Sequence, residues 1–476
     1  MSRYAAALDF GSSKVALAVG EKTSSGVKIV SYHDTESAGI ECGEIVNDFK
    51  VEEIVRSLME KAQKDIHEPI EEVSVGISGR ALHSKDLPCT INRTDPKAYI
   101  TEAEVGEITR KRYNANLENG ETVFEAIPQN YSTEDRIGIT HEELIGMVGS
   151  RIEADFKLFY GRKSILDRRT TVLDKCGLVM NKAILAPIAS ARAVLSRPEM
   201  ENGVALVDIG RSTTEVAIVK DNIVRHAAII PFGGESVTGD IKNELNITSR
   251  WAEIIKTEYG RCCEEYAVDN KKLVLKNENE IVDGEVELTL LARVIEARMS
   301  EIFDAVHYVI EQSGYASRIS AGVVITGGCC HLDNIIQLAS ALLGQKIRLA
   351  APQGSIDSSS KEASFDVYAS TAVGLVLETL DPMLSHAIER KQSPVTQSAG
   401  QQEDNTFFGQ EVEEEEETVA ETARERRERR KEEERRAKEQ RKKEEAERKE
   451  REKAEKEKQP KQPSIFDMLF SNNDKA

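Results

Sequence analysis

Blocks of apolar and polar residues along the first 380 positions predict strands that alternate with helices. In segment 52–64 the apolar residues recur at helical spacing, whereas Val73 to Ser78 alternates as a strand does. Further helices are expected near Thr101 to Asn114 and from Pro187 onward. This order of elements predicts an α/β fold.

One strand–turn–strand pattern occurs twice, as AAALDFGSSKVALAVGE (5–21) and VALVDIGRSTTEVAIVK (204–220). A repeat of this kind predicts two similar lobes whose turns face one another. Each turn offers a carboxylate, successive backbone N–H groups and hydroxyls, which suit a phosphate chain and its hydrated Mg²⁺. An ordinary glycine-bearing hairpin is the alternative for either turn alone. The candidate phosphate-binding residues are Asp9, Gly11, Ser12, Ser13, Lys14, Asp208, Gly210, Arg211, Ser212 and Thr213. Asp9 and Asp208 are also the candidate Mg²⁺ residues, acting through water.

A third segment, AGVVITGGCCHL (321–332), is predicted to be a buried strand that runs through Gly327 and Gly328 into a helix. Paired glycines let the backbone approach a ligand closely at a helix N-terminus, although a plain strand-to-helix turn is an equal alternative. Two helices rich in small residues, beginning near Pro187 and Ala369, could cross closely and connect the lobes. Ordinary helix packing explains them nearly as well.

The three segments resemble the phosphate-one, phosphate-two and adenosine motifs of the actin and sugar-kinase superfamily. Shorter matches resemble the FtsA family of bacterial cell-division proteins: SVGISGR (74–80), AIPQNY (126–131), AEIIKTEYGRC (252–262) and STAVGL (370–375). The resemblance covers about residues 3–380. It implies an actin-like, ribonuclease H-like fold with two duplicated lobes and a nucleotide cleft between them. It also implies ATP and Mg as ligands, with adenosine contacts from Gly233, Gly234, Glu253, Lys256, Gly327 and Gly328. A surface i,i+3 ion pair is the alternative for Glu253 and Lys256.

The same resemblance divides the chain into subdomains. Residues 1–82 and 163–202 form subdomain IA, with subdomain IC inserted at 83–162. Residues 203–240 and 315–390 form subdomain IIA, with subdomain IIB inserted at 241–314. Beyond them, composition alone predicts a disordered linker (391–423), a charged single helix (424–458) and an amphipathic C-terminal segment (459–476).

Charge and cysteine content narrow the class of protein further. A net charge of −19 argues against a nucleic-acid-binding protein, which usually has a basic face. No apolar run approaches the ~18 residues that a membrane span needs, and the N-terminus has no signal-peptide pattern. The seven cysteines form no CxxC pair, so small buried residues in a reducing cytoplasm are expected.

By resemblance, the protein is an ATP-binding scaffold that polymerises and tethers the FtsZ ring to the cytoplasmic membrane at the division site, as a cytoplasmic, peripheral protein. The insert at 83–162 would bind other division proteins, and Arg298 would bind an acidic peptide of FtsZ, although a solvated arginine is the more ordinary alternative. Membrane contact is expected from Ile465, Phe466, Leu469 and Phe470, with a protein-binding peptide as the alternative.

Two features of the sequence bear on catalysis. The helix at 186–195 offers only Ser190 and Arg192 as polar side chains, so slow ATP hydrolysis or none is expected. Arg211 stands where the family usually has a glycine. If the backbone at this position is left-handed, a residue other than glycine costs ~1–2 kcal/mol there. Otherwise the turn has shifted, and the guanidinium reaches the γ-phosphate.

The alternative functions are a phosphotransferase of the sugar-kinase branch, which needs a carboxylate base that we cannot place, and a chaperone ATPase, which the charged tail argues against.

Overall fold

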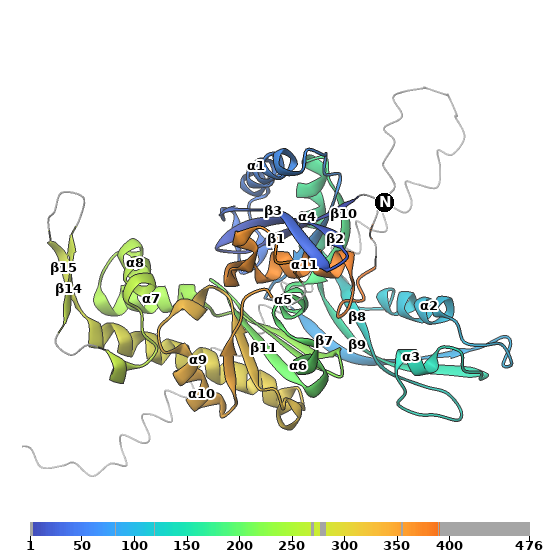
Figure 1. Ribbon diagram of the computed structural model, residues 1–476. Coiled ribbons are helices and arrows are strands. Elements are labelled where there is room, and N and C mark those ends of the chain that lie inside the picture. The colour runs from blue at the N-terminus through green and yellow to red at the C-terminus, as the bar shows by residue number, and fades with distance from the viewer. Residues whose placement is uncertain are drawn as a thin grey trace, which may run out of the picture. The chain divides into compact units, whose positions relative to one another are not determined.

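The computed structural model of the protein describes residues 3–390, apart from residues 81, 119, 268–270, 277–281, 354–355 and 389 (Figure 1). The linker, the charged helix and the amphipathic segment predicted for 391–476 lie outside the described residues, as do Ile465, Phe466, Leu469 and Phe470.

The first lobe is built on a five-stranded sheet with the order β10-β6-β1-β2-β3. Its strands are β1 (Tyr4–Phe10), β2 (Lys14–Thr23), β3 (Gly26–Glu36), β6 (Glu72–Ile77) and β10 (Val179–Leu185). The first three strands form an antiparallel meander, and β6 and β10 add in parallel on the other side of β1. Because β1 and β2 are buried along most of their length, the turn between them is held by a rigid core.

The second lobe repeats this sheet strand for strand, in the order β13-β12-β11-β16-β17. Its strands are β11 (Val204–Ile209), β12 (Thr214–Lys220), β13 (Ile223–Ile230), β16 (Val323–Thr326) and β17 (Ile347–Leu349). Again three strands form an antiparallel meander and two add in parallel beside the first. The duplicated two-lobe α/β fold predicted from the repeated turns is therefore confirmed.

Helices pack against both sheets. In the first lobe α1 (Asp48–Ile66) and α11 (Ser370–Leu380) lie on opposite sides of the sheet, and α4 (Ser164–Lys175) packs beside α1 (Figure 1). In the second lobe α9 (Leu288–Gln312) packs on the sheet and α10 (Ile335–Leu343) packs against α9. Helix α6 (Arg197–Asn202) packs against β12, and α7 (Gly234–Leu245) packs against both α9 and α8 (Ser249–Tyr259). Two short hairpins, β4–β5 (Ile40–Glu41, Glu44–Ile45) and β14–β15 (Lys272–Lys276, Val282–Glu287), complete the lobes.

The two small-residue helices do cross closely. Helix α5 (Ala186–Val194) follows β10, and α11 packs directly on it. A Cβ atom built on Gly374 of α11 would overlap the carbonyl oxygen of Ala189 in α5, so only glycine permits this approach. The crossing buries both helices between the two lobes, and it fixes how closely the lobes' sheets can approach one another.

The insert within residues 83–162 has its own core. A sheet of order β7-β9-β8 is formed by β7 (His83–Asn92), β8 (Glu121–Ser132) and β9 (Arg151–Arg162). Helices α2 (Glu102–Tyr113) and α3 (His141–Leu144) accompany it, each opened by a threonine capping box. The insert also contacts the second lobe, because the Gln129 amide donates to the Val224 carbonyl oxygen at 3.1 Å.

Two buried glutamates fasten the last described segment to the insert and to α11. The backbone N–H groups of Met383–Ser385 all donate to the Glu378 carboxylate at 3.0 Å. The Ser385 hydroxyl and the His386 N–H donate to Glu125 of β8. Burial raises the pKa of Glu125 to about 8, so this side chain keeps its proton at neutral pH.

Among the described residues, all seven cysteines are free thiols, and all but Cys176 are buried, in agreement with the sequence-based expectation. The helices that the structure describes are all too short or too polar to span a bilayer.

The α5–α11 crossing predicts a large effect of one methyl group. We expect Gly374→Ala to lower the free energy of unfolding by at least about 1–3 kcal/mol, because overpacking against a backbone carbonyl forces the helices apart. Gly106→Ala in α2 is the matched control: its new Cβ meets open space, so it should stabilise the protein by up to about 1 kcal/mol. Denaturant unfolding measures both, and equal effects would contradict the tight crossing.

The Glu125 site predicts a pH dependence of stability. Its folded pKa of about 8 lies above that of an unfolded glutamate, so the folded state binds more protons between these values. Wild-type stability should therefore fall relative to Glu125→Gln as pH rises from about 4.5 to 8, by at most about 1.4 kcal/mol per pH unit. Thermal unfolding across this pH range tests it; parallel curves for the two proteins would show that Glu125 ionises normally.

Candidate functional site

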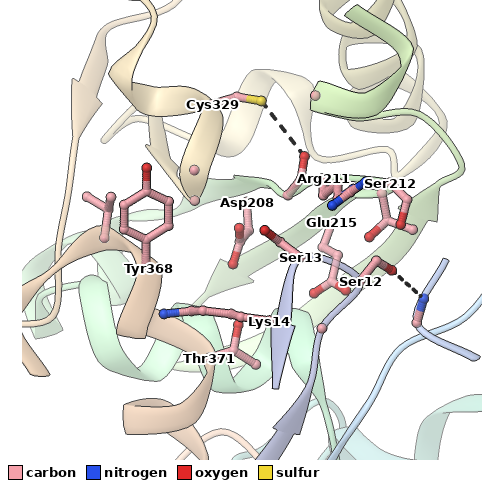
Figure 2. Close-up of a pocket in the computed structure, with 18 of the residues that line it drawn as sticks. Ser12, Ser13, Lys14, Asp208, Arg211, Ser212, Glu215, Cys329, Tyr368 and Thr371 are labelled. Carbon is pink, nitrogen blue, oxygen red and sulfur yellow. Dashed lines mark hydrogen bonds between the residues drawn. The ribbon is translucent and has the colours of Figure 1, made fainter. Parts of the chain in front are cut away.

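A cleft of about 880 Å³ lies where the two repeated turns face each other (Figure 2). It brings together nearly all the residues predicted to bind nucleotide: Asp9, Gly11, Ser12, Ser13, Lys14, Asp208, Gly210, Arg211, Ser212, Thr213, Gly234, Glu253, Lys256, Gly327 and Gly328. Gly233 lies just behind this wall as the N-cap of α7, packed so that a Cβ would come within 2.6 Å of the Gly210 carbonyl oxygen. Arg298 is elsewhere.

The first turn joins β1 to β2 and presents hydroxyls to the cleft. Gly11 is required there, because a Cβ would lie 2.7 Å from the Lys14 carbonyl oxygen. Ser12 Oγ accepts a hydrogen bond from the Gly43 N–H at 3.1 Å, which holds the turn against the β4–β5 hairpin. The Lys14 ammonium donates to Asp34 at 2.7 Å, so it is already ion-paired beside the cleft.

The second turn is held by both helices of the crossing and by β16. Ser190 of α5 donates to Asp208 at 2.8 Å, and its hydroxyl lies 3.0 Å from that of Thr371 of α11. Gly327 has a φ of +88°, and a Cβ there would overlap the Asp208 carboxylate. Only glycine at position 327 therefore lets β16 end against this acid.

A third carboxylate, which the sequence analysis did not single out, joins the two aspartates. Glu215 is the direct cross-strand partner of Asp208 in the β11–β12 hairpin, and it lines the cleft. The Ser78 hydroxyl of the first lobe donates to Glu215 Oε1 at 2.5 Å, so this bond spans the cleft. Glu215 Oε2 is buried and has no hydrogen-bond partner among the described residues. The hairpin register was the signal for Glu215, whereas nothing in the sequence pairs Ser78 with it.

The electrostatics of the three acids fit a bound cation. Burial raises the pKa of Asp9 to about 6 and that of Glu215 to about 8, and it also raises the pKa of Asp208. Loss of water and the repulsion of neighbouring negative charges therefore make each of the three acids harder to ionise than in water. A hydrated Mg²⁺ would supply the missing positive charge. Within the described part of the chain, no three Asp, Glu, His or Cys side chains are arranged to ligate a metal directly.

The other end of the cleft combines a buried lysine with stacked rings. Lys256 Nζ donates to Glu253 at 2.8 Å, to Thr238 Oγ1 at 2.8 Å and to the Gly234 carbonyl at 3.1 Å. The i,i+3 ion pair thus exists, and both of its members line the cleft. His331 and Tyr368 also line it, with ring centroids 5.1 Å apart in a stacked arrangement. Such an aromatic wall suits a planar base.

One detail of the predicted adenosine segment is corrected. Gly327 and Gly328 lead into a short 3₁₀ helix, Gly328–His331, and not directly into an α-helix; α10 begins at Ile335. Asn334 is in a left-handed conformation just before α10, so the chain turns there before the α-helix starts. The close backbone approach at Gly327 nevertheless remains.

The two arginines of interest have different settings. Arg211 has no positive φ, so the cost of a left-handed backbone does not arise. Its side chain lines the cleft, half-exposed, 3.5 Å from the Glu235 carboxylate. Arg298 on α9 donates to Asp240 at 3.0 Å and to Glu301 at 2.6 Å, so it is held within the fold and is not a solvated cation.

Two family models match the chain. The model described as cell division protein FtsA matches residues 205–374, and the one described as an SHS2 domain inserted in FtsA matches residues 79–160. The chain is 28% identical to cell division protein FtsA of Neisseria meningitidis serogroup B over 378 residues, covering 79% of this chain and 89% of the relative. It is 29% identical to the Pseudomonas aeruginosa protein of the same name over 371 residues, covering 78% and 88%.

Among solved structures, a chain of the PilM–PilN type IV pilus biogenesis complex superposes with a TM-score of 0.56 at 15% identity. The match covers 79% of this chain and 99% of that one. At this identity the likeness concerns the fold alone, which is the actin-like arrangement of two duplicated lobes.

Proposed function

We propose that this chain, which belongs to the FtsA family of cell division proteins, binds Mg·ATP between its lobes and uses the nucleotide to set the surfaces that it offers to other division proteins. The observation on which this rests is the convergence of two turns from opposite lobes on one cleft, with three carboxylates between them: Glu215 is buried, and Asp9 and Asp208 are partly buried.

Each part of the ligand has a matching part of the cleft. Gly11, Ser12 and Ser13 on one side and Ser212 and Thr213 on the other offer hydroxyls and N–H groups for phosphate oxygens. Asp9 and Asp208 are the residues that would hold a hydrated Mg²⁺, which would supply positive charge for the phosphates. At the far end, the Lys256 network and the stacked His331 and Tyr368 receive the nucleoside.

Glu215 provides the group that hydrolysis requires and that α5 lacks. Its Oε2 is buried at the cleft without a hydrogen-bond partner among the described residues, and Ser78 fixes Oε1. A carboxylate so held can orient a water molecule and accept its proton. Because burial favours the protonated form, only a fraction of the sites would be competent, and turnover would be slow.

Beyond the cleft, the proposed role is that of a polymerising scaffold that tethers the FtsZ ring to the inner face of the cytoplasmic membrane. Family membership supports it: such a protein needs a surface for FtsZ, a surface for its own copies and a membrane contact. The insert at 83–162 is the proposed surface for other division proteins, and residues 459–476, outside the described part of the chain, are the proposed membrane contact. Because Arg298 is already paired, an acidic FtsZ peptide would have to compete with Asp240 for it.

Removal of either turn aspartate tests nucleotide binding. We expect Asp9→Ala and Asp208→Ala each to weaken Mg·ATP binding by about 10–100-fold, the usual effect of losing a group that orients a bound metal. Glu36→Ala is the control, since Glu36 lines the cleft but lies outside both turns and should leave the affinity unchanged. Calorimetric titration decides, and tight binding by the Asp9 and Asp208 double variant would refute the two-turn site.

Glu215→Gln separates binding from hydrolysis. Glutamine keeps the shape and the Ser78 hydrogen bond but cannot accept a proton, so we expect Mg·ATP affinity to persist while any steady-state hydrolysis falls by about 10²–10⁴-fold. Phosphate release measures the rate. Hydrolysis at the wild-type rate in the variant would exclude Glu215 as the group that activates water.

The membrane role is tested by shortening the chain. We expect a protein truncated after Gln459 to lose co-sedimentation with anionic phospholipid vesicles while its Mg·ATP affinity stays unchanged, because the cleft lies within the lobes. The full-length double variant Phe466→Ser, Phe470→Ser controls for length and should also lose binding. Undiminished vesicle binding by the truncated protein would rule out this segment as the anchor.

A further inference from the structure

Arg169 is a buried arginine that lies behind the cleft. It comes from α4, is 1% exposed, and does not line the cleft itself. Its guanidinium donates to four main-chain carbonyl oxygens: Gly43 at 2.8 Å, Ile165 at 2.9 Å, Gly76 at 3.1 Å and Ser78 at 3.5 Å. It also lies over the Phe10 ring, 5.6 Å from the centroid.

Burying an arginine lowers the stability of the fold unless other interactions compensate for the lost hydration. A charge taken from water must be compensated, and a well-packed apolar side chain of similar volume often serves stability as well or better. Here the negative charges of Asp9 and Glu44 favour the cation, and four carbonyl oxygens accept its hydrogen bonds. Burial accordingly lowers the pKa of Arg169 to about 10, which still leaves it charged at neutral pH.

Three of the four carbonyls that Arg169 binds belong to two segments that shape the phosphate end of the cleft, and the fourth, that of Ile165, lies within α4. Gly43 donates its N–H to Ser12 in the first turn, so a fixed Gly43 fixes that hydroxyl. Ser78 donates its hydroxyl to Glu215 across the cleft. Both Gly43 and Ser78 line the cleft, and Gly76 packs beside Asp9, since a Cβ there would lie 3.5 Å from Asp9 Oδ1. One side chain thus connects the wall beside Ser12 to the wall beside Glu215.

We propose that Arg169 is a positioning residue for the polyphosphate part of the ligand: it never touches the nucleotide, but it holds segments 42–43 and 76–78 so that Ser12 and Ser78 meet the phosphates and Glu215 in a preformed geometry. This inference rests on the proposed nucleotide binding. The planar guanidinium suits the task because its five donors diverge toward carbonyls on three separate segments, whereas a lysine presents its donors from one atom.

The position of Arg169 predicts a selective effect. Its contacts lie at the phosphate end, and none of its four hydrogen bonds reaches Gly234, Glu253 or Lys256 at the nucleoside end. Loss of the guanidinium should therefore weaken binding of Mg·ATP but not of adenosine. A merely structural role would lower thermal stability and change both affinities alike.

The test compares Arg169→Met, Arg169→Lys and Arg168→Met with wild type in the full chain. Arg168 is the matched control, because it is the neighbouring arginine of α4, half-exposed and bonded to the Ile45 carbonyl at 2.7 Å outside the cleft. Calorimetry gives the Mg·ATP affinity, and ligand-observed NMR gives the adenosine affinity. We expect Arg169→Met to lower the ratio of the Mg·ATP affinity to the adenosine affinity by about 10–100-fold, the range for residues that orient a metal-binding group. Arg168→Met should leave this ratio unchanged.

The outcomes separate the two proposals. If wild type binds neither Mg·ATP nor adenosine, nucleotide binding itself is refuted, and the role of Arg169 with it. If wild type binds both and Arg169→Met keeps the wild-type ratio, only the role of Arg169 is overturned. Should Arg169→Met fail to fold, Arg169→Lys decides: a lowered ratio supports the positioning role, and a wild-type ratio overturns it.

Discussion

The crossing of α5 and α11 is the contact on which the cleft depends. Because Gly374 has no side chain, α11 rests directly on the backbone of Ala189, and the hydroxyls of Ser190 and Thr371 come together beside Asp208. The helix pair therefore does two things at once: it sets the separation of the two sheets and holds the acid of the second turn. Any rotation of one lobe against the other must pass through this crossing, so the proposed binding of nucleotide at Asp208 would be mechanically connected to the orientation of the lobes.

Part of the electrostatic cost of the fold lies in the cleft. Asp9 and Asp208 are partly buried beside the buried Glu215, and desolvation raises the pKa of each. This cost would fall if a divalent ion were bound, because its positive charge would stabilise the ionised carboxylates. Stability is thus given up at the position where a ligand can return it, which is the usual relation between strained sites and function. The hydrogen bond from Ser78 to Glu215 crosses between the lobes, so both lobes contribute to this group of acids.

The sequence predicted the elements that repeat, but it did not reveal the contacts between residues that are far apart along the chain. The duplicated turns and the small-residue helices are local patterns, so the fold and the phosphate turns could be derived from them. Glu215 was within reach of the sequence, since closing the hairpin pairs it with Asp208. Ser78 and Arg169 were not, because their partners lie 137 and 126 residues away, and no periodicity relates them. The ion pair of Arg298 with Asp240 was also out of reach, because the sequence gave no sign that these two residues, 58 positions apart, lie together.

The shared cleft is tested most directly by hydrogen–deuterium exchange of the full chain during titration with Mg·ATP. If one nucleotide bridges the lobes, protection should appear in residues 9–14 of the first lobe and in residues 208–214 and 327–331 of the second, all with one midpoint. Protection confined to one lobe, or separate midpoints for the two turns, would contradict a single site between them.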